Sequence, residues 1–334
     1  MKRVAVAMGG PSKEHDVSLA SGRAVVAGLK EAGLSVLPLW IKRDTNVVFS
    51  LPSDQKKDLG VSLCKALDSM TDIDCVFIAM HGPFGEDGVF QAMLEARGIP
   101  FTGSDHVGAS ISMDKILSKR VYESVGLTVP PYRVLKAGYC KSDAGVRQVA
   151  QKTAEELGIP IVLKTPRLGS SVGIAIVHTM DELINQLQRL AGMDSHILAE
   201  GFISGREFTV PVLEEDGQAY ALPIIEIKVH SHGFFDYETK YDPNMVDEVC
   251  PAPIPEQLSK RLSQLGIVAH ETLMLSGLSR SDFIVDEKGR IYILETNSIP
   301  GLTEVSLFPK AATVAGIGFP DLLMRLCQAA VSRQ

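Results

Sequence analysis

The chain has 334 residues, 45% hydrophobic and 22% charged, with a formal net charge of −7, and this balance without a basic tract argues against nonspecific nucleic-acid binding. Its five dispersed cysteines include no CxxC pair, which excludes a zinc-finger spacing and a disulfide framework and fits a reducing cytosol. No apolar run reaches the length of a membrane span, so we expect a cytoplasmic protein that does not bind membranes.

The first hundred residues alternate strand and helix patterns. The apolar run from Val4 to Met8 closes at a glycine pair, which is typical of a buried parallel strand. Asp16 or Ser18 can cap the helix that follows. The other elements predicted here are strands over 35–41 and 75–80 and a helix over 88–96. This βαβ series predicts a parallel sheet with covering helices.

The rest of the chain changes character twice. Two helices (107–112 and 115–125) precede a hairpin-like pair over 159–164 and 172–177 and a helix over 181–190, which together predict an α+β unit. After residue 200 the strands become antiparallel in character, with strands predicted over 207–213 and 220–229. A helix over 256–275 and a final hairpin follow. We therefore expect three domains, over 1–104, 105–203 and 204–334.

The final hairpin carries the strongest local signal. With a symmetric turn over 286–289, Val285 pairs with Arg290 and Asp282 lies opposite Ile293. Alternation along both strands then places four polar residues on one face, provided that no bulge intervenes: Arg280, Asp282, Glu295 and Asn297. Two carboxylates and a carboxamide favour a Mg²⁺ site. A solvated polar sheet face is the alternative that the pattern leaves open.

A second signal indicates bound phosphate. Lys164 ends an apolar strand, where a lysine is costly unless its ammonium group reaches an anion or water. The loop over 169–173 follows, and its glycines and serines can donate hydrogen bonds to an anion, although Walker A spacing is missing. A plain turn is the alternative. The aromatic and charged tract over 234–241 predicts a long loop of the kind that forms lids.

These signals stand among further motifs that together resemble the D-alanine–D-alanine ligase family of ATP-grasp enzymes along nearly the entire chain. The ordered set is specific although no single motif is. The matching segments are Gly9-Gly10-Pro11-Ser12-Lys13-Glu14 with Val17-Ser18, His81-Gly82 with Gly85-Glu86-Asp87-Gly88, Met113-Asp114-Lys115, Gly169-Ser170-Ser171-Val172-Gly173, Ser204-Gly205-Arg206-Glu207, Tyr237-Glu238-Thr239-Lys240-Tyr241, and Glu295-Thr296-Asn297 through Pro300-Gly301.

The resemblance implies a fold and a reaction. The fold is a three-domain ATP-grasp architecture of α/β and α+β units, with an N-terminal parallel α/β domain and ATP held between two antiparallel sheets. In the reaction, ATP phosphorylates the carboxylate of a first D-alanine, and the amine of a second D-alanine attacks the acyl phosphate. The product serves peptidoglycan precursor synthesis. The resemblance also implies a homodimer.

The resemblance further assigns residues to ATP and metal. Phosphates would be bound by Lys115, Lys164 and Lys240, with the Ser170–Ser171 loop closing over them. Glu200 would meet the adenine amine, the Ile203 backbone the adenine ring, and Glu207 the ribose hydroxyls. Two Mg²⁺ ions, for which Mn²⁺ could substitute, would be held by Asp282, Glu295 and Asn297.

The substrate residues follow in the same way. Glu14 would pair with the ammonium group of the first D-alanine, and His81 would orient that substrate. Arg280 and the Gly301 N–H would stabilise the oxyanion, which requires fixed donors. Ser306 would bind the carboxylate of the second D-alanine. Tyr241 would link Ser170 to Glu14 and hold the lid shut.

Four other functions compete with this one. A D-alanine–D-lactate or D-alanine–D-serine ligase shares the first half-reaction, and the Lys240-Tyr241 pair favours the dipeptide enzyme. Another ATP-grasp carboxylate–amine ligase fits less well with Glu14 and Ser306. A non-catalytic binding module would be expected to lack a metal carboxylate or Arg280. A dinucleotide-binding dehydrogenase would carry a GxGxxG fingerprint, which is missing after the first strand.

Overall fold

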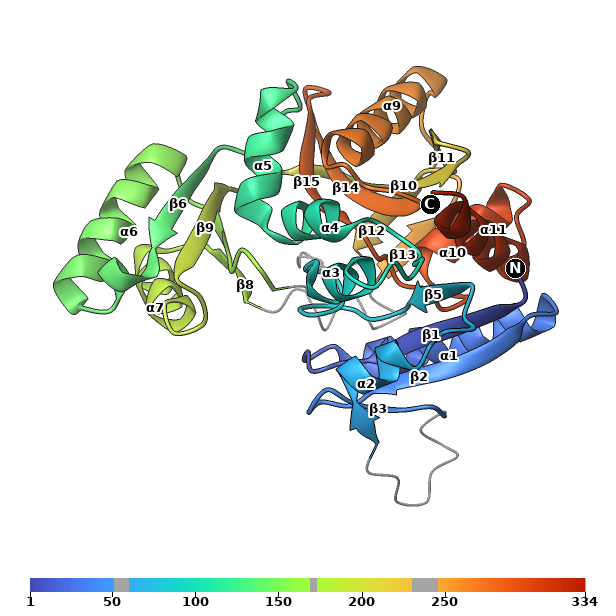
Figure 1. The fold of residues 1–334 in the computed structure, drawn as a ribbon. Helices are drawn as coiled ribbons and strands as arrows, with labels where there is room; N and C mark the ends of the chain where they lie inside the picture. Colours follow the sequence, from blue (N-terminus) through green and yellow to red (C-terminus); the bar gives the residue numbers. More distant parts are fainter. Residues whose placement is uncertain (51–59, 169–172, 230–245, 334) are drawn as a thin grey trace.

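The computed structural model describes residues 1–50, 60–168, 173–229 and 246–333. These residues form three β-sheets, each packed against helices (Figure 1). Within the described part, no single helix is long and apolar enough to cross a membrane, and α10 (Leu307–Val314) and α11 (Phe319–Ser332) meet that test only as a pair bent by 103°. The combination of one partly parallel sheet and two antiparallel sheets confirms the predicted α/β and α+β fold class.

The N-terminal sheet has the strand order β4-β3-β2-β1-β5. Its strands are β1 (Arg3–Gly9), β2 (Ser35–Ile41), β3 (Asn46–Val48), β4 (Val61–Ser62) and β5 (Cys75–Ile78). Strand β1 pairs in parallel with both β2 and β5, as the βαβ pattern predicted. The helices that follow these strands are α1 (His15–Glu31), α2 (Leu63–Asp68) and α3 (Val89–Glu95).

Helix α1 begins earlier than predicted, since Glu14 rather than Asp16 or Ser18 is its N-cap residue. It lies close to β1 because Gly22 has no side chain: a Cβ there would overlap Met8. On the same helix, a Cβ at Gly28 would meet Leu323 Cδ1 at 2.7 Å. Helix α1 therefore packs between the first strand and the C-terminal end of the chain.

The last two helices, α10 (Leu307–Val314) and α11 (Phe319–Ser332), complete the N-terminal core. Phe308 and Leu322 are fully buried in the same hydrophobic cluster as Val6 and Met8. The two chain ends consequently lie on one side of the molecule (Figure 1). This contact places the loop before α10 beside the N-terminal sheet, and that loop carries Gly301.

The central sheet is antiparallel, with the order β6-β9-β7-β8. Its strands are β6 (Tyr132–Lys136), β7 (Ile161–Lys164), β8 (Ile174–Val177) and β9 (His196–Gly201). Helices α6 (Asp143–Leu157) and α7 (Met180–Leu190) share its hydrophobic core, and a 3-10 turn, η2 (Ala137–Cys140), joins β6 to α6. The predicted hairpin is confirmed as the β7–β8 pair, and Lys164 is the last residue of its first strand.

The C-terminal sheet has the order β13-β12-β10-β14-β15, with β11 also paired to β10. Its strands are β10 (Gly205–Glu215), β11 (Gln218–Ala221), β12 (Ile225–Val229), β13 (Val246–Val249), β14 (Leu278–Asp286) and β15 (Ile291–Asn297). The single strand predicted over 220–229 is instead two strands. They are separated at Pro223, which has no N–H to donate to a sheet ladder.

Three helices border the C-terminal sheet: α4 (His106–Met113), α5 (Lys115–Ser124) and α9 (Glu256–Thr272). Tyr122 of α5 is fully buried among the sheet residues Phe208 and Phe283, and its hydroxyl donates to Thr296 Oγ1 at 2.8 Å. Helix α5 lies between the central and C-terminal sheets (Figure 1).

The register of the β14–β15 hairpin differs from the predicted one. Asp282 lies directly opposite Glu295, and the predicted position opposite Ile293 was wrong. Val285 pairs with Ile291, one residue beyond its predicted partner. The pairing of the two carboxylates is therefore more direct than the symmetric turn suggested.

Two displacements explain this register. Asp286 pairs with Arg290 across a three-residue loop whose Gly289 has a φ of +75°, so the turn is one residue shorter than predicted. That displacement alone would put the two carboxylates on opposite faces of the sheet. A bulge at Leu294, where the register shifts between Asp282 and the next residue, adds a second displacement and restores the shared face.

Candidate active site

The first part of the site lies at the point in the N-terminal sheet where the order of the strands reverses. Strand β1 has β2 on one side and β5 on the other, and in open parallel sheets ligands bind at the carboxyl ends of such strands. The two loops there, over 10–14 and 79–88, carry the predicted residues Glu14 and His81. We call them the N-terminal loops.

His81 is held rigidly inside the N-terminal loops and is only 6% exposed. Its Nε2 lies 2.8 Å from Ser21 Oγ, and its backbone N–H donates to Ser18 Oγ at 2.9 Å. The backbone oxygen of His81 accepts from Ser12 Oγ at 2.8 Å. The two N-terminal loops are thus tied to each other and to α1.

Glu14 and a second carboxylate, Glu86, converge on Gly82. The Gly82 N–H donates to Glu86 Oε2 at 2.5 Å, and a Cβ added to Gly82, whose φ is +75°, would overlap Glu14 Oε2. Burial, followed by the neighbouring charge of Glu14, raises the pKa of Glu86 to about 8. Sequence reasoning gave Glu86 no role, although its motif was among those that matched the family.

This arrangement predicts a pH-dependent stability. Between pH 4.5 and about 8 the folded protein holds a proton on Glu86 that the unfolded chain releases, so stability contributed by this group is lost as pH rises through that window. We expect Glu86→Gln to raise the melting temperature at pH 8 but to change it little at pH 5. Glu31→Gln, an exposed change on α1, should alter neither. Equal effects of Glu86→Gln at both pH values would contradict the assignment.

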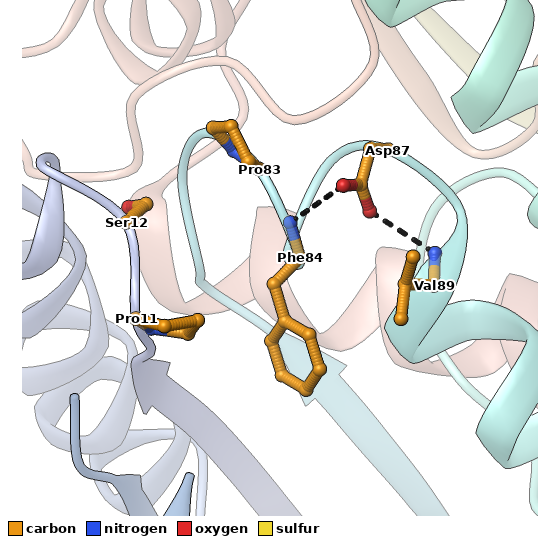
Figure 2. Close-up of a pocket in the computed structure, with 6 residues that line it drawn as sticks. All are labelled: Pro11, Ser12, Pro83, Phe84, Asp87 and Val89. Carbon is orange, nitrogen blue, oxygen red and sulfur yellow. Dashed lines mark hydrogen bonds between the residues drawn. The ribbon is translucent and has the colours of Figure 1, made fainter. Parts of the chain in front are cut away.

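A small open pocket borders the N-terminal loops (Figure 2). Its volume is about 330 Å³, and it is lined by Pro11, Ser12, Pro83, Phe84, Asp87 and Val89. Asp87 shapes its rim, because its carboxylate accepts from the backbone N–H of Phe84 at 2.8 Å and of Val89 at 3.1 Å. The same two bonds fix the loop that carries Glu86.

The second part of the site is the polar face of the β14–β15 hairpin, which we call the carboxylate face. It consists of Arg280, Asp282, Glu295 and Asn297, paired across the two strands. Asp282 accepts two hydrogen bonds from the Arg280 guanidinium group, at 3.1 and 3.0 Å, and one from Thr209 Oγ1 at 2.6 Å. Glu295 Oε2 lies 3.0 Å from Lys115 Nζ. Each carboxylate therefore already has a cationic partner.

The residues of the carboxylate face fit a divalent cation. Asp282 and Glu295 supply hard oxygen donors, and Asn297 Nδ2 lies 3.4 Å from Asp282 Oδ2, which places its amide in the same cluster. Among the described residues no group of three or more His, Cys, Asp and Glu side chains is arranged to hold a metal.

Glu207 shares the carboxylate face from the neighbouring strand. It pairs with Ile284 while Thr209 pairs with Asp282, so its side chain points to the same side of the sheet as Asp282. Burial, then the charges of Asp282 and Glu295, raises the pKa of Glu207 to about 7. Lys164 and Arg280 act in the opposite direction. The buried Lys164 of the central sheet thus acts electrostatically on the carboxylate face.

The third part of the site is a buried ion cluster on the central sheet. Glu200, 2% exposed, lies between two lysines, with Oε1 at 2.5 Å from Lys119 Nζ and Oε2 at 2.7 Å from Lys164 Nζ. Burial opposes the charge of Glu200, but the two lysines hold its pKa below the usual value. Sequence reasoning identified Glu200 and Lys164 and missed Lys119. Its spacing of four from Lys115 on one helix was the available signal.

The remaining predicted residues lie in loops around these parts. A Cβ on Gly301 would lie 2.9 Å from Ser306 Oγ, so the structure brings these two residues together. Ser306 Oγ also lies 2.7 Å from Thr303 Oγ1. Ile203 lies in the connection between β9 and β10, where the chain passes from the central to the C-terminal sheet. The predicted residues that lie outside the described part of the chain are Ser170, Ser171, Lys240 and Tyr241.

Electrostatic coupling joins the separate parts of the site. The positive charges of Lys115 and Arg280, in the second part, oppose the rise in the pKa of Glu86. The charge of Glu86 in turn contributes to raising the pKa of Arg280. Clustered carboxylates and buried lysines on two antiparallel sheets are the arrangement that the resemblance to ATP-grasp enzymes implies.

The comparisons identify the family within that class. The family profiles described as the D-ala D-ala ligase N-terminus and C-terminus match residues 3–104 and 121–328. The D-alanine–D-alanine ligase of Desulforudis audaxviator is 40% identical over 334 residues, covering 100% of both chains. That of Geobacter sulfurreducens is 39% identical over 325 residues, covering 97% of this chain and 92% of its own. The chain belongs to the D-alanine–D-alanine ligase family and is an enzyme.

Solved structures agree with this assignment. The VanG D-Ala:D-Ser ligase from Enterococcus faecalis superimposes with a TM-score of 0.82 at 28% identity, covering 98% of this chain and 99% of its own. The Bacillus anthracis D-alanine–D-alanine ligase complexed with ATP superimposes with a TM-score of 0.77 at 31% identity, covering 100% and 98%. These likenesses support the fold class predicted from the sequence.

Proposed function

We propose that this protein joins two D-alanines to D-alanyl-D-alanine through an acyl phosphate, converting ATP to ADP and phosphate, in peptidoglycan precursor synthesis. The main support is the convergence of the Glu14–Glu86 pair, which suits an ammonium group, with the carboxylate face and its arginine, which suit a phosphorylated carboxylate. The relatives named above carry the same activity in their names.

In this proposal the first D-alanine lies between the N-terminal loops and the carboxylate face. Glu14 binds its ammonium group, and His81, fixed by Ser21, orients it. Arg280 and the Gly301 N–H stabilise the negative charge that develops on the reacting carboxyl oxygen. Ser306, beside Gly301, holds the carboxylate of the second D-alanine. Tyr241, with Ser170, closes the lid over the site.

ATP would occupy the space between the central and C-terminal sheets. Its phosphates would be bound by Lys115, Lys164, Ser171 and Lys240, and its base and ribose by Glu200, Ile203 and Glu207. Asp282, Glu295 and Asn297 would hold two Mg²⁺ ions, or Mn²⁺, which supply charge neutralisation at the transferring phosphoryl group. The binding of phosphates would also give Lys115 an anionic partner besides Glu295.

The assembly and its setting are part of the same proposal. We propose three domains over 1–104, 105–203 and 204–334, a homodimer, a cytoplasmic location, and small-molecule partners without nucleic acid or membrane. Gel filtration with light scattering would test the homodimer directly, because a single mass of 36.1 kDa would contradict it.

A second candidate function is ligation of D-alanine to D-serine. The structural likeness to the VanG D-Ala:D-Ser ligase, with its TM-score of 0.82, supports it. The two functions share the first half-reaction and differ only in the second substrate. They are therefore separated by the product.

The test is to measure phosphate release with ATP and Mg²⁺ and to identify products by mass, offering D-alanine alone and then with D-serine or D-lactate. We expect D-alanyl-D-alanine from D-alanine alone. Glu14→Gln should raise the KM for D-alanine about 10- to 100-fold, because it removes the charged partner of the ammonium group. Glu31→Gln on the same helix should not. Product only with D-serine or D-lactate would move the chain to the second function, and no turnover with any of them would overturn both.

A further inference from the structure

Helix α5 connects the two antiparallel sheets through lysines that lie one turn apart. Lys115 and Lys119 occupy the same face of the helix because four residues span about one turn. Lys115 pairs with Glu295 of the C-terminal sheet at 3.0 Å, whereas Lys119 pairs with Glu200 of the central sheet at 2.5 Å. The helix is also tied to the C-terminal sheet through the Tyr122 hydroxyl.

Lys119 is an unusual side chain for such a position. It is fully buried, with an exposed fraction of 0%, and its ammonium group lies 5.8 Å from the centre of the Tyr132 ring. Burying a lysine is costly, and an ion pair repays that cost only with good geometry. A structural ion pair needs only one lysine for one carboxylate. Here Glu200 has two, so one of the lysines is more than the pair itself requires.

The two lysines differ in where they can act. Lys164 is the last residue of β7, whereas Lys119 projects from α5 and contacts the other oxygen of Glu200. With Lys119 in place, only one Glu200 oxygen is engaged by Lys164. Without it, both oxygens would compete for the Lys164 ammonium group and draw it toward the sheet.

We propose that Lys119 is a positioning residue for nucleotide binding: it neutralises one side of Glu200 and fixes α5 to the central sheet, so that Lys164 stays directed at the nucleotide phosphates. The inference rests on the proposed use of ATP. It predicts that Lys119 affects phosphate recognition without touching the nucleotide. Its effect therefore depends on the number of phosphates and not on the base.

The test compares the binding of ADP and of adenosine by calorimetry, together with the KM values for ATP and D-alanine. We expect Lys119→Met to weaken ADP binding about tenfold or more, while adenosine affinity and the KM for D-alanine change less than about twofold. Lys119→Arg, which keeps the charge, should recover most of the ADP affinity. Arg120→Met, which removes the adjacent exposed cation of α5, is the matched control and should bind ADP normally.

A double variant tests whether the unbalanced charge of Glu200 causes the loss of ADP binding. Lys119→Met leaves a buried carboxylate with one partner fewer and lowers the melting temperature, whereas Lys119→Met with Glu200→Gln removes the unbalanced charge. The double variant should regain stability and should also recover ADP binding relative to adenosine, because the neutral amide at position 200 no longer draws the Lys164 ammonium group toward the sheet. ADP binding that stays weak relative to adenosine in the double variant, or equal losses for ADP and adenosine in Lys119→Met, would overturn the inference. Wild-type ADP binding without dipeptide formation would overturn only the proposed reaction, and no ADP binding would overturn both.

Discussion

Replacing Arg280 by alanine should lower kcat roughly 10²- to 10³-fold, the range found when one donor to a developing oxyanion is removed. The side chain is only 8% exposed, and its guanidinium group is held by two hydrogen bonds to Asp282, so its direction is set before substrate binds. A fixed, desolvated donor stabilises a transition state more than a mobile one, because no reorganisation is needed. The KM for ATP should change less than kcat.

The loss must be separated from an effect on the metal site, because Arg280→Ala also frees Asp282. The kcat should therefore be measured at saturating Mg²⁺, where the expected loss persists. Arg280→Lys should give an intermediate value, since lysine keeps the charge but not the two-pronged geometry. Arg290→Ala, an exposed arginine in the turn of the same hairpin, is the matched control. A kcat that recovers fully with added Mg²⁺ would contradict the role at the oxyanion.

Replacing Asp282 by asparagine should lower kcat/KM about 10²- to 10³-fold at low Mg²⁺, because loss of a metal ligand removes charge stabilisation worth several kcal/mol. The change is close to isosteric, and the asparagine oxygen can still accept the bond from Thr209, now at 2.6 Å. The protein should therefore remain folded. The midpoint of activation by Mg²⁺ should move to a higher concentration.

The binding of Mn²⁺, followed by paramagnetic relaxation of water protons, reports on the metal without turnover. It should weaken in Asp282→Asn and stay unchanged in Glu287→Gln, which alters an exposed residue of the same hairpin. Unchanged Mn²⁺ affinity together with lost activity would assign Asp282 to holding Arg280 rather than to binding the metal.

Much of the local structure could be predicted because it depends on neighbouring residues. Strand β2 has the predicted bounds, and Lys164 ends β7 as the apolar pattern indicated. The shared face of the four residues around Asp282 and Glu295 was also predicted, but from the wrong register. The four side chains still share one face because a shorter turn and a bulge each displace the second strand by one residue, and the two displacements together restore the alternation.

Contacts between distant segments could not be predicted from these patterns. The burial of Glu86 depends on both N-terminal loops, and the partner of Lys119 is 81 residues away in the chain, on β9. A surface lysine on α5 and a buried one have the same local sequence pattern. Only the packing of that helix between two sheets distinguishes them.

The sequence by itself determined the family, many of the helices and strands, and the residue types of the site, because motifs, turn residues and hydrophobic periodicity act over a few positions along the chain. The tertiary structure decided which charges meet: Asp282 with Glu295, Glu14 with Glu86, and Glu200 with two lysines. Those pairings arise from the packing of three sheets and their helices. Burial there excludes water, which strengthens the electrostatic interaction between neighbouring charges.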